Sequence, residues 1–427
     1  MKGKKQFIFF GLLALSIPVI AQKKALDFFI SSGLRQNTLL LQNTNLQQNF
    51  ELQRELINAQ NKKPQVSFTA DYLFAPFFFD NGQPISITSN PSPKAYGYDA
   101  SITNGGLYAA QLNAAVPLFN AATLKNLYAE NKAAADVSTL SRKQTEYDAT
   151  KAIIDQYIVT YQFQQQEGYL QKIIDRLAER KPLVEALVKK GLLQQNDYLL
   201  LDIQLLNAVN DLRQMQFSYN SGLGLLKNLS LISDTSNYVL DKPMLTLNPD
   251  PEELYYLQRF KLDSLNLIAQ QNVFNNKYRP QVTVTGTTGI NAVELARIPH
   301  NIGVSAAVHL AIPISDGHQR KLNDRSVAIQ LTNQQIDRDN TALLRKNNLR
   351  NARQQIEQWQ QTIAMDEEPI RKQELLLDII KEKVVKGQVT VMDYINALQD
   401  YAVMQKTRAI AESSLLLYIN QYNYYNH

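Results

Sequence analysis

The sequence contains no cysteine among its 427 residues. Disulfides, thiolate zinc sites and cysteine nucleophiles are therefore excluded, and so is an anchor attached through a lipid on an N-terminal cysteine. The four histidines show no ligand spacing, so we predict no metal site. The acids are scattered and no Ser-His-Asp or paired-carboxylate arrangement can be argued, so we expect neither an enzyme nor a cofactor.

Net charge is also small. The 44 basic and 39 acidic residues give +5, and Lys2, Lys4 and Lys5 lie before the first acid, so the chain from residue 22 onward carries 41 basic residues against 39 acidic ones. Nucleic-acid binding needs basic residues clustered on one face. We therefore expect no nucleic-acid partner.

Long hydrophobic runs are confined to the N-terminus. Three lysines precede an apolar stretch over residues 7–21, which ends in Ala21 before the polar Gln22. This layout is typical of a secretory signal and predicts cleavage after Ala21. An uncleaved anchor is the alternative, although the run is shorter than the ~20 residues that a spanning helix needs. No second run follows, so any other segment that enters a membrane must do so as strands.

An internal repeat organises the rest of the chain. Pro64-Gln65-Val66 recurs at Pro280-Gln281-Val282, and two later landmarks recur at a constant offset of 196 residues. These later pairs are Val116-Pro117-Leu118-Phe119 with Ile312-Pro313-Ile314-Ser315, and Lys190-Gly191 with Lys386-Gly387. We predict repeats over 22–229 and 251–427 joined by a linker over 230–250. The extra residues of the first repeat fall in a proline-bearing loop between Pro64 and Val116.

Each repeat is predicted to hold one β-hairpin, over residues 64–118 and 280–314. Apolar and polar residues alternate with a period of two, as in Val66, Phe68 and Ala70 against Gln65, Ser67 and Thr69. About ten residues with one apolar face suit a transmembrane barrel, but a half-buried soluble sheet alternates in the same way. We expect charged substitutions at Val284 and Leu112 to separate the two cases.

The remainder is predicted to be helical, over residues 24–62, about 121–185, 192–228, 252–278, 318–383 and 389–424. At ~1.5 Å per residue the longest would extend about 90–100 Å, so such helices must pack laterally. Pro182 and Pro369 either kink the two longest helices or restart them. Gly191 and Gly387 suit the left-handed residue after a helix end, so Lys190-Gly191 and Lys386-Gly387 are interpreted as tips of helical hairpins.

Four strands per chain cannot close a barrel, since the smallest transmembrane barrels have eight. Either the sheet is soluble or several chains share one barrel. Eight strands leave an interior filled by side chains, so a conduit favours three chains and twelve strands.

With these features in order and present twice, the mature chain from about residue 24 to residue 424 resembles the TolC-like outer-membrane efflux proteins. The resemblance rests on the tandem repeat, the two strand ends near Pro117 and Pro313, and the two tips that continue to Asp197-Tyr198 and Asp393-Tyr394. It implies a mainly α-helical chain with transmembrane β-strands. Three copies would form a homotrimer with a 12-stranded outer-membrane β-barrel, in contact with outer-membrane lipid, and a periplasmic α-barrel of long hairpins.

The resemblance also implies a role as an exit duct for tripartite efflux or type I secretion, partnered by a periplasmic adaptor and an inner-membrane transporter that supplies the energy. The tips would form the adaptor-docking surface and the periplasmic aperture; their residues are Lys190, Gly191, Leu192, Lys386, Gly387 and Gln388.

Asp393 falls on the first of two family aspartates that ring the aperture, whereas the second position is Asn396. Asp197 falls on an aspartate that takes part in the family's closing links. The partners of those links fall on Val389 and Val384, which cannot form them, so we expect other contacts to hold the aperture. The alternative for Asp197 and Asp393 is helix capping.

Two function classes follow. The leading hypothesis is the trimeric duct without catalysis. The alternative is a soluble periplasmic coiled-coil scaffold or adaptor, in which the strands form a small sheet. Only the duct requires the apolar strand faces to meet lipid, and neither class indicates the cargo.

Overall fold

The computed structural model describes residues 22–427 except for residues 89, 99–105 and 294. The expected signal segment, residues 1–21, lies outside the described residues. The chain forms two compact units. The first unit comprises the chain up to Leu40, Thr145–Pro251 and Arg345–His427, and the second comprises Leu41–Gln144 and Glu252–Leu344. Each unit therefore draws on both sequence repeats.

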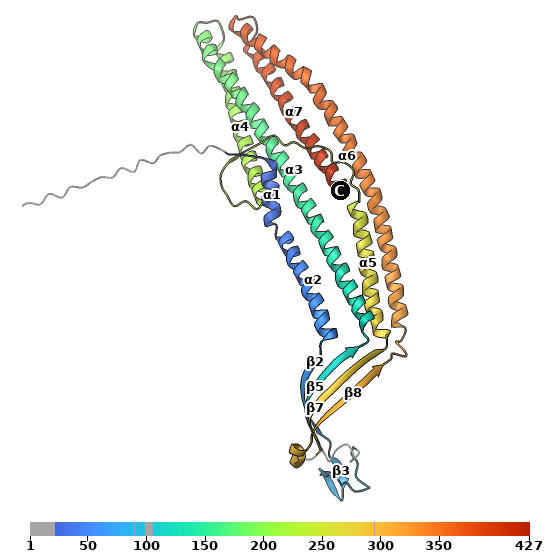
Figure 1. The fold of residues 1–427 in the computed structure, drawn as a ribbon. Coiled ribbons are helices and arrows are strands. Elements are labelled where there is room, and N and C mark those ends of the chain that lie inside the picture. The colour runs from blue at the N-terminus through green and yellow to red at the C-terminus, as the bar shows by residue number, and fades with distance from the viewer. Residues whose placement is uncertain (1–21, 89, 99–105, 294) are drawn as a thin grey trace, which may run out of the picture. The chain divides into compact units, whose positions relative to one another are not determined.

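A four-stranded antiparallel sheet forms one end of the second unit (Figure 1). Its order is β2-β5-β7-β8, with β2 at Gln65–Phe74, β5 at Gly106–Leu118, β7 at Gln281–Ala292 and β8 at Ile302–Ala311. The two predicted hairpins are confirmed, and β5 pairs with β7 to join them, with Val116 opposite Val284. The sheet is thus built equally from the two repeats.

Long helices lead to and from this sheet (Figure 1). They are α2 (Thr38–Lys62), α3 (Ala121–Lys189), α5 (Tyr255–Asn275) and α6 (Gln319–Val385). Polar side chains link them laterally: Gln47 donates to Thr139 at 3.0 Å, and Ser264 donates to Gln334 at 2.6 Å. The expected lateral packing of long helices is present.

The prediction of one helix over 24–62 is wrong at Asn37. Helix α1 covers Leu26–Gln36, and α2 restarts at Thr38. Asn37 has an extended backbone, and its Oδ1 accepts from the N–H groups of Leu39 and Leu40 at 2.9 and 3.2 Å. The asparagine side chain satisfies the first amides of α2, which makes a restart at this position favourable.

Two helical hairpins dominate the first unit. One pairs α3 with α4 (Gln195–Leu229), and the other pairs α6 with α7 (Val391–Tyr425). Pro182 and Pro369 lie inside uninterrupted helices, so neither starts a new helix. A shared apolar core joins the two hairpins, with Leu177, Leu201, Leu377, Val391 and Leu398 almost fully buried.

The linker contains a strand that the sequence analysis did not predict. Strand β6 (Tyr238–Leu240) pairs in parallel with β1 (Gln22–Lys24). The Tyr157 hydroxyl donates to the carbonyl oxygens of Lys24 and Asp241 at 3.0 and 2.8 Å, which binds the two strands to α3. Tyr157 packs in a second core with Phe29, Tyr219, Tyr238 and Leu240.

Part of the loop predicted between Pro64 and Val116 forms a small two-stranded sheet. Strands β3 (Phe77–Asp80) and β4 (Gln83–Ser86) form a hairpin whose turn residues Asn81 and Gly82 have φ values of 45° and 85°. Asn-Gly with two positive φ values is the usual type I′ hairpin turn. That dipeptide was the available signal for the hairpin.

Candidate functional site

The sheet of the second unit has one continuous apolar face. Register places Phe68 opposite Leu112, and Leu112 opposite Thr288, which in turn is opposite Val304. Large apolar side chains on this face remain exposed, and they are Val66, Phe68, Tyr72, Phe74, Leu112, Ile302, Val304, Val308 and Leu310. A soluble monomer rarely exposes so large an apolar surface, so this face is a candidate contact surface for lipid or protein.

The opposite face of the same sheet is polar and internally hydrogen-bonded. Thr287 donates to Asn113 at 2.9 Å, and Asn113 donates to Thr69 at 2.9 Å, which links β7, β5 and β2. His309 lies 3.2 Å from the Thr285 hydroxyl on this face. The two faces therefore differ in the way that the alternation predicted.

Within the described chain, β2 and β8 each pair on one side only, so the sheet ends in two open edges. Both edge strands are ten residues long, and every residue in each is exposed. Unpaired backbone groups along such edges favour pairing with further strands.

The two hairpin tips in the first unit share one backbone design. Gly191 and Gly387 have φ values of 70° and 66°. The Leu192 N–H donates to the Leu187 carbonyl at 3.0 Å, and the Gln388 N–H donates to the Lys383 carbonyl at 3.0 Å. These are Schellman-type helix ends, in which a glycine accepts the left-handed conformation without a Cβ clash. The predicted reversal at both glycines is confirmed.

Other predicted tip residues lie at the surface. Lys190, Leu192, Lys386 and Gln388 are exposed. Exposed side chains on both tips leave them accessible for a partner in the chain as described.

The two predicted aspartates cap the helices that begin after the tips. Asp197 accepts from the Gln194 N–H at 3.0 Å. Asp393 accepts from the N–H and hydroxyl of Thr390 at 2.9 and 2.7 Å, and the Asp393 N–H donates back to Thr390 at 3.1 Å. The hydrogen bonds from Thr390 hold the pKa of Asp393 below its usual value, because they favour the charged form. Both aspartates therefore cap the helices that begin after the tips, as the alternative interpretation expected.

An exposed polar stripe continues from Asp393 along α7. Asn396 follows one turn later and Asp400 two turns later, and all three are exposed. Residues seven apart share one side of a helix. Asn396 was among the residues predicted from the sequence and Asp400 was not, although its spacing of seven from Asp393 is visible there.

Ionic contacts join the two hairpins near this stripe. Arg176 on α3 reaches Glu374 and Asp378 on α6 at 3.4 and 4.0 Å, and its guanidinium lies 5.4 Å from the centre of the Tyr401 ring on α7. Lys381 on α6 pairs with Glu179 on α3 at 3.4 Å. We call this set of contacts the Arg176 link.

The two valines that the resemblance places at linking positions lie in the apolar core. Val384 is buried in the core between the hairpins, and Val389 is partly buried against it. Both therefore contribute to apolar packing.

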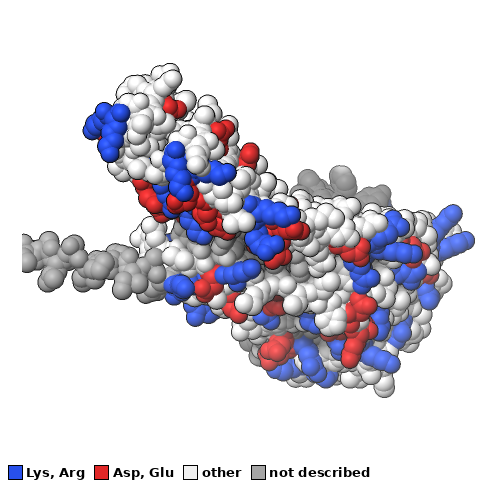
Figure 2. Space-filling view, turned by 90° about the horizontal axis from the view of Figure 1, so that it is seen from above, with Lys and Arg blue, Asp and Glu red and all other residues white. Residues whose placement is uncertain are grey.

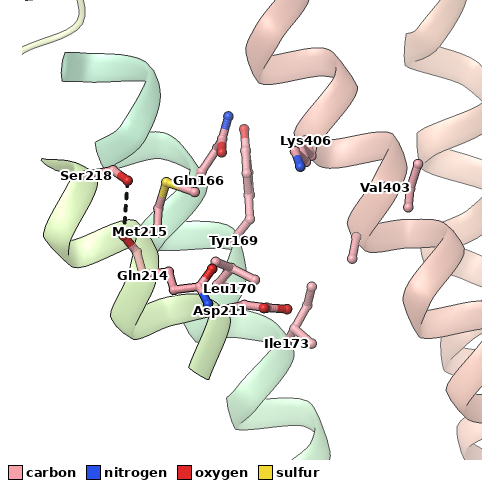
Figure 3. Close-up of a pocket in the computed structure, with 11 residues that line it drawn as sticks. Gln166, Tyr169, Leu170, Ile173, Asp211, Gln214, Met215, Ser218, Val403 and Lys406 are labelled. Carbon is pink, nitrogen blue, oxygen red and sulfur yellow. Dashed lines mark hydrogen bonds between the residues drawn. The ribbon is translucent and has the colours of Figure 1, made fainter. Parts of the chain in front are cut away.

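A cavity of about 350 Å³ lies between the α3–α4 hairpin and α7 (Figure 3). Its walls combine apolar side chains with amide and hydroxyl groups, and Asp211 and Lys406 come from different helices. Burial raises the pKa of Tyr169, so its hydroxyl stays protonated at neutral pH. The Ser218 hydroxyl in the lining donates to the Gln214 carbonyl oxygen at 3.1 Å (Figure 3).

Among the described residues, none of the helices is both long and apolar enough to cross a membrane. No group of three or more His, Asp or Glu side chains in this part of the chain is placed to hold a metal ion. Figure 2 shows Lys and Arg side chains interspersed with Asp and Glu side chains over the face in view.

Solved structures of outer-membrane channels match this architecture. The channel OprN matches with a TM-score of 0.72 at 14% identity, over 94% of this chain and 89% of that one. CmeC of Campylobacter jejuni matches with 0.71 at 13% identity, over 94% and 85%. MtrE of Neisseria gonorrhoeae, solved in its open state, matches with 0.71 at 13% identity, over 94% and 88%.

This chain has the fold of a TolC-like outer-membrane channel. The match extends over 94% of the residues, so it includes more of the chain than the helices alone. No protein-family model matches the sequence, and a search of curated proteins finds no relative. The likeness to the channels is thus one of structure, at a sequence identity of 12–14%.

Proposed function

We propose that this chain is the protomer of a trimeric outer-membrane duct, which passively conducts substrates delivered by an inner-membrane transporter and a periplasmic adaptor. One observation carries the proposal: a sheet with an exposed apolar face, a polar opposite face and two open edges, in a chain with the TolC-like fold. Lipid would cover the apolar face, and water would fill the space behind the polar face.

The strand count supports sharing of one barrel. An even number of antiparallel strands leaves β2 and β8 running in opposite directions, so β8 of one copy can pair with β2 of the next in the same antiparallel sense. Three copies give twelve strands and close every edge, which backbone groups in lipid require. Two copies would give eight strands and an interior filled by side chains.

The long hairpins are then periplasmic, and their tips face the adaptor. Exposed residues at both tips support this assignment: Leu192 is 67% exposed at one tip, and Lys386 and Gln388 are exposed at the other. Energy for transport comes from the inner-membrane partner, so the duct itself needs no catalytic residue.

The stripe on α7 is proposed to line the periplasmic aperture. Three copies of Asp393 around one axis would attract cations. Asn396 lowers the negative charge at the next turn, and Asp400 restores it one turn further on. The duct would therefore have two rings of carboxylates separated by a ring of amides.

The Arg176 link is proposed to hold the aperture in the absence of a partner. It joins α3 to α6 and α7 within one chain. Under this proposal, opening of the aperture separates the two hairpins and breaks these contacts. This link takes the place of contacts that Val384 and Val389 cannot make.

The soluble scaffold is the competing function. The matched channels favour the duct, because the match includes strands as well as helices. A decisive experiment extracts the protein from membranes in detergent and measures its native mass and its conductance in a planar bilayer. The duct predicts a particle of three chains that forms pores. A soluble monomer or dimer without pores would refute it.

A further inference from the structure

The small hairpin β3–β4 carries an exposed apolar patch that the duct function does not use. Phe78 lies opposite Ile85 on β4, and it also forms a bridge with Tyr96 through two backbone hydrogen bonds of 2.7 and 2.9 Å. Residues directly opposite one another point to the same side of a sheet. Three apolar side chains therefore form a row across three segments, and all three are exposed.

The hairpin is an ordered unit that holds these side chains outward. Phe77 is 3% exposed and lies beneath Gly97, where an added Cβ would come within 2.5 Å of its ring. Asp80 is 5% exposed and accepts from the Ser92 N–H at 2.7 Å. Buried contacts on one side of the hairpin therefore fix the direction of the row on the other.

Phe79 adds to the patch at an unusual backbone position. Its φ is 58°, a conformation that a bulky residue rarely adopts, and the residue is 67% exposed. Its ring packs edge-on against Tyr96 at 6.4 Å. A strained aromatic residue that remains exposed points to a function outside the fold of the hairpin itself.

We propose that this patch, formed by Phe78, Phe79, Ile85 and Tyr96, is a membrane anchor that inserts into the outer leaflet beside the barrel. The proposal rests on the proposed duct function, because that function places the apolar face of the sheet in lipid. The occupant is the interfacial region of the bilayer.

Chain geometry supports this occupant. Strand β2 has ten residues, and at ~3.4 Å per residue with a tilt of about 40° it rises about 26 Å, which matches the ~25 Å apolar band of an outer-membrane barrel. Phe74 ends that strand, and Phe78 follows four residues later, so it lies within about 14 Å of Phe74. The patch therefore begins where the hydrocarbon region ends.

Composition agrees with a lipid interface. Between residues 75 and 98 the only charged residues are Asp80, which is buried, and Lys94. Aromatic side chains favour the boundary between hydrocarbon and headgroups. Tyr72 and Tyr108 form a ring pair at 5.0 Å at this end of the sheet, so the patch continues an aromatic band that begins on the apolar face.

Single-tryptophan variants test the anchor, because Trp359 is the only tryptophan in the chain. Three proteins are reconstituted into vesicles that contain brominated phosphatidylcholine, which quenches tryptophan in contact with it. They are the native chain, Trp359→Phe with Phe68→Trp, and Trp359→Phe with Phe78→Trp. Iodide in the aqueous phase serves as a second quencher, which quenches tryptophan that is exposed to water. Ile85→Trp replaces Phe78→Trp if the latter variant does not assemble.

The anchor predicts that Phe78→Trp is quenched by the brominated lipid about as strongly as Phe68→Trp, and is protected from iodide. Quenching by iodide alone would place the patch in water and overturn the anchor. Protection from both quenchers would show that another protein surface covers the patch and would also overturn it. Absence of lipid quenching at Phe68→Trp would instead refute the duct itself, so the two failures are distinguishable.

Discussion

Two neighbouring alanines on β8 provide a direct test of where lipid meets the sheet. Ala306 lies opposite Gly286 on the apolar face, and Ala307 lies opposite Thr285 on the polar face. Both are exposed and both sit at the centre of the ten-residue strand. The same substitution, Ala→Lys, can therefore be made at two adjacent sites that differ only in the face they occupy.

The expected difference follows from the solvent of each face. A lysine on the lipid face near the bilayer midplane costs about 2–4 kcal/mol, whereas a lysine facing a water-filled lumen costs little. At 1.4 kcal/mol per factor of ten, Ala306→Lys should lower the ratio of assembled to unassembled protein by about 30-fold to 700-fold. Ala307→Lys should leave the ratio nearly unchanged.

The assay measures folding into vesicles at increasing urea concentrations, with trimer content read by native mass and insertion read by protection from protease. Equal effects of the two substitutions would contradict the assignment of lipid to the apolar face. A water-exposed sheet would tolerate both, since surface substitutions usually change stability by less than about 0.5 kcal/mol.

Three further predictions concern the helices. Arg176→Met should raise the single-channel open probability by up to about fivefold, since a partly exposed ion pair contributes about 0–1 kcal/mol. The control Arg338→Met removes a pair with the adjacent Asp339 and should leave the open probability unchanged. Equal open probabilities for the two variants would show that the Arg176 link does not hold the aperture. Gly191→Ala should lower the free energy of unfolding by about 1–2 kcal/mol, because alanine is strained at the positive φ of this position. Gly168→Ala lies within α3 with open space at its Cβ, and it should raise the free energy of unfolding by about 0.5–1 kcal/mol. Changes of the same sign in the two variants would contradict the tip geometry. Burial raises the pKa of Tyr219 to about 12. Its folded-state pKa exceeds the ordinary value of 10, so its contribution to the free energy of unfolding is complete below pH 10 and is lost between pH 10 and 12. In thermal scans, Tyr219→Phe should therefore reduce the fall in unfolding free energy over this pH range by about 2–3 kcal/mol.

Local sequence patterns predicted much of the architecture correctly. Periodicity and glycine placement predicted the helix ends near Lys189 and Val385 and the reversals at both tip glycines. Periodicity also predicted the two β-hairpins β2–β5 and β7–β8. The helix ends and the tips depend on residues close together in the chain, because their hydrogen bonds span four or five residues. The strands of the hairpins were predicted from alternation within each strand, which is also a local pattern.

Side chains that compete with regular structure were harder to predict. The Asn37 side chain ends one helix and begins the next, and Asn81-Gly82 turns a hairpin inside an expected loop. Asp393 was assigned by resemblance to an aperture, and the structure adds its capping contacts with Thr390. These local alternatives differ by about 1 kcal/mol, which a pattern of apolar residues does not resolve.

The remaining features depend on contacts between distant parts of the chain. Pairing of β5 with β7 joins residues some 170 positions apart, β1 pairs with β6 across more than 200, and Arg176 meets Glu374 across 198. Sequence periodicity indicates which residues of an element face a neighbouring element, but it does not indicate which element that neighbour is. The amphipathic strands and the long helices were therefore determined by the order of residues alone. Their neighbours, the open sheet edges and the exposed row around Phe78 were decided only when tertiary packing brought distant segments together, because burial and strand pairing act on whichever surfaces the folded chain places in contact.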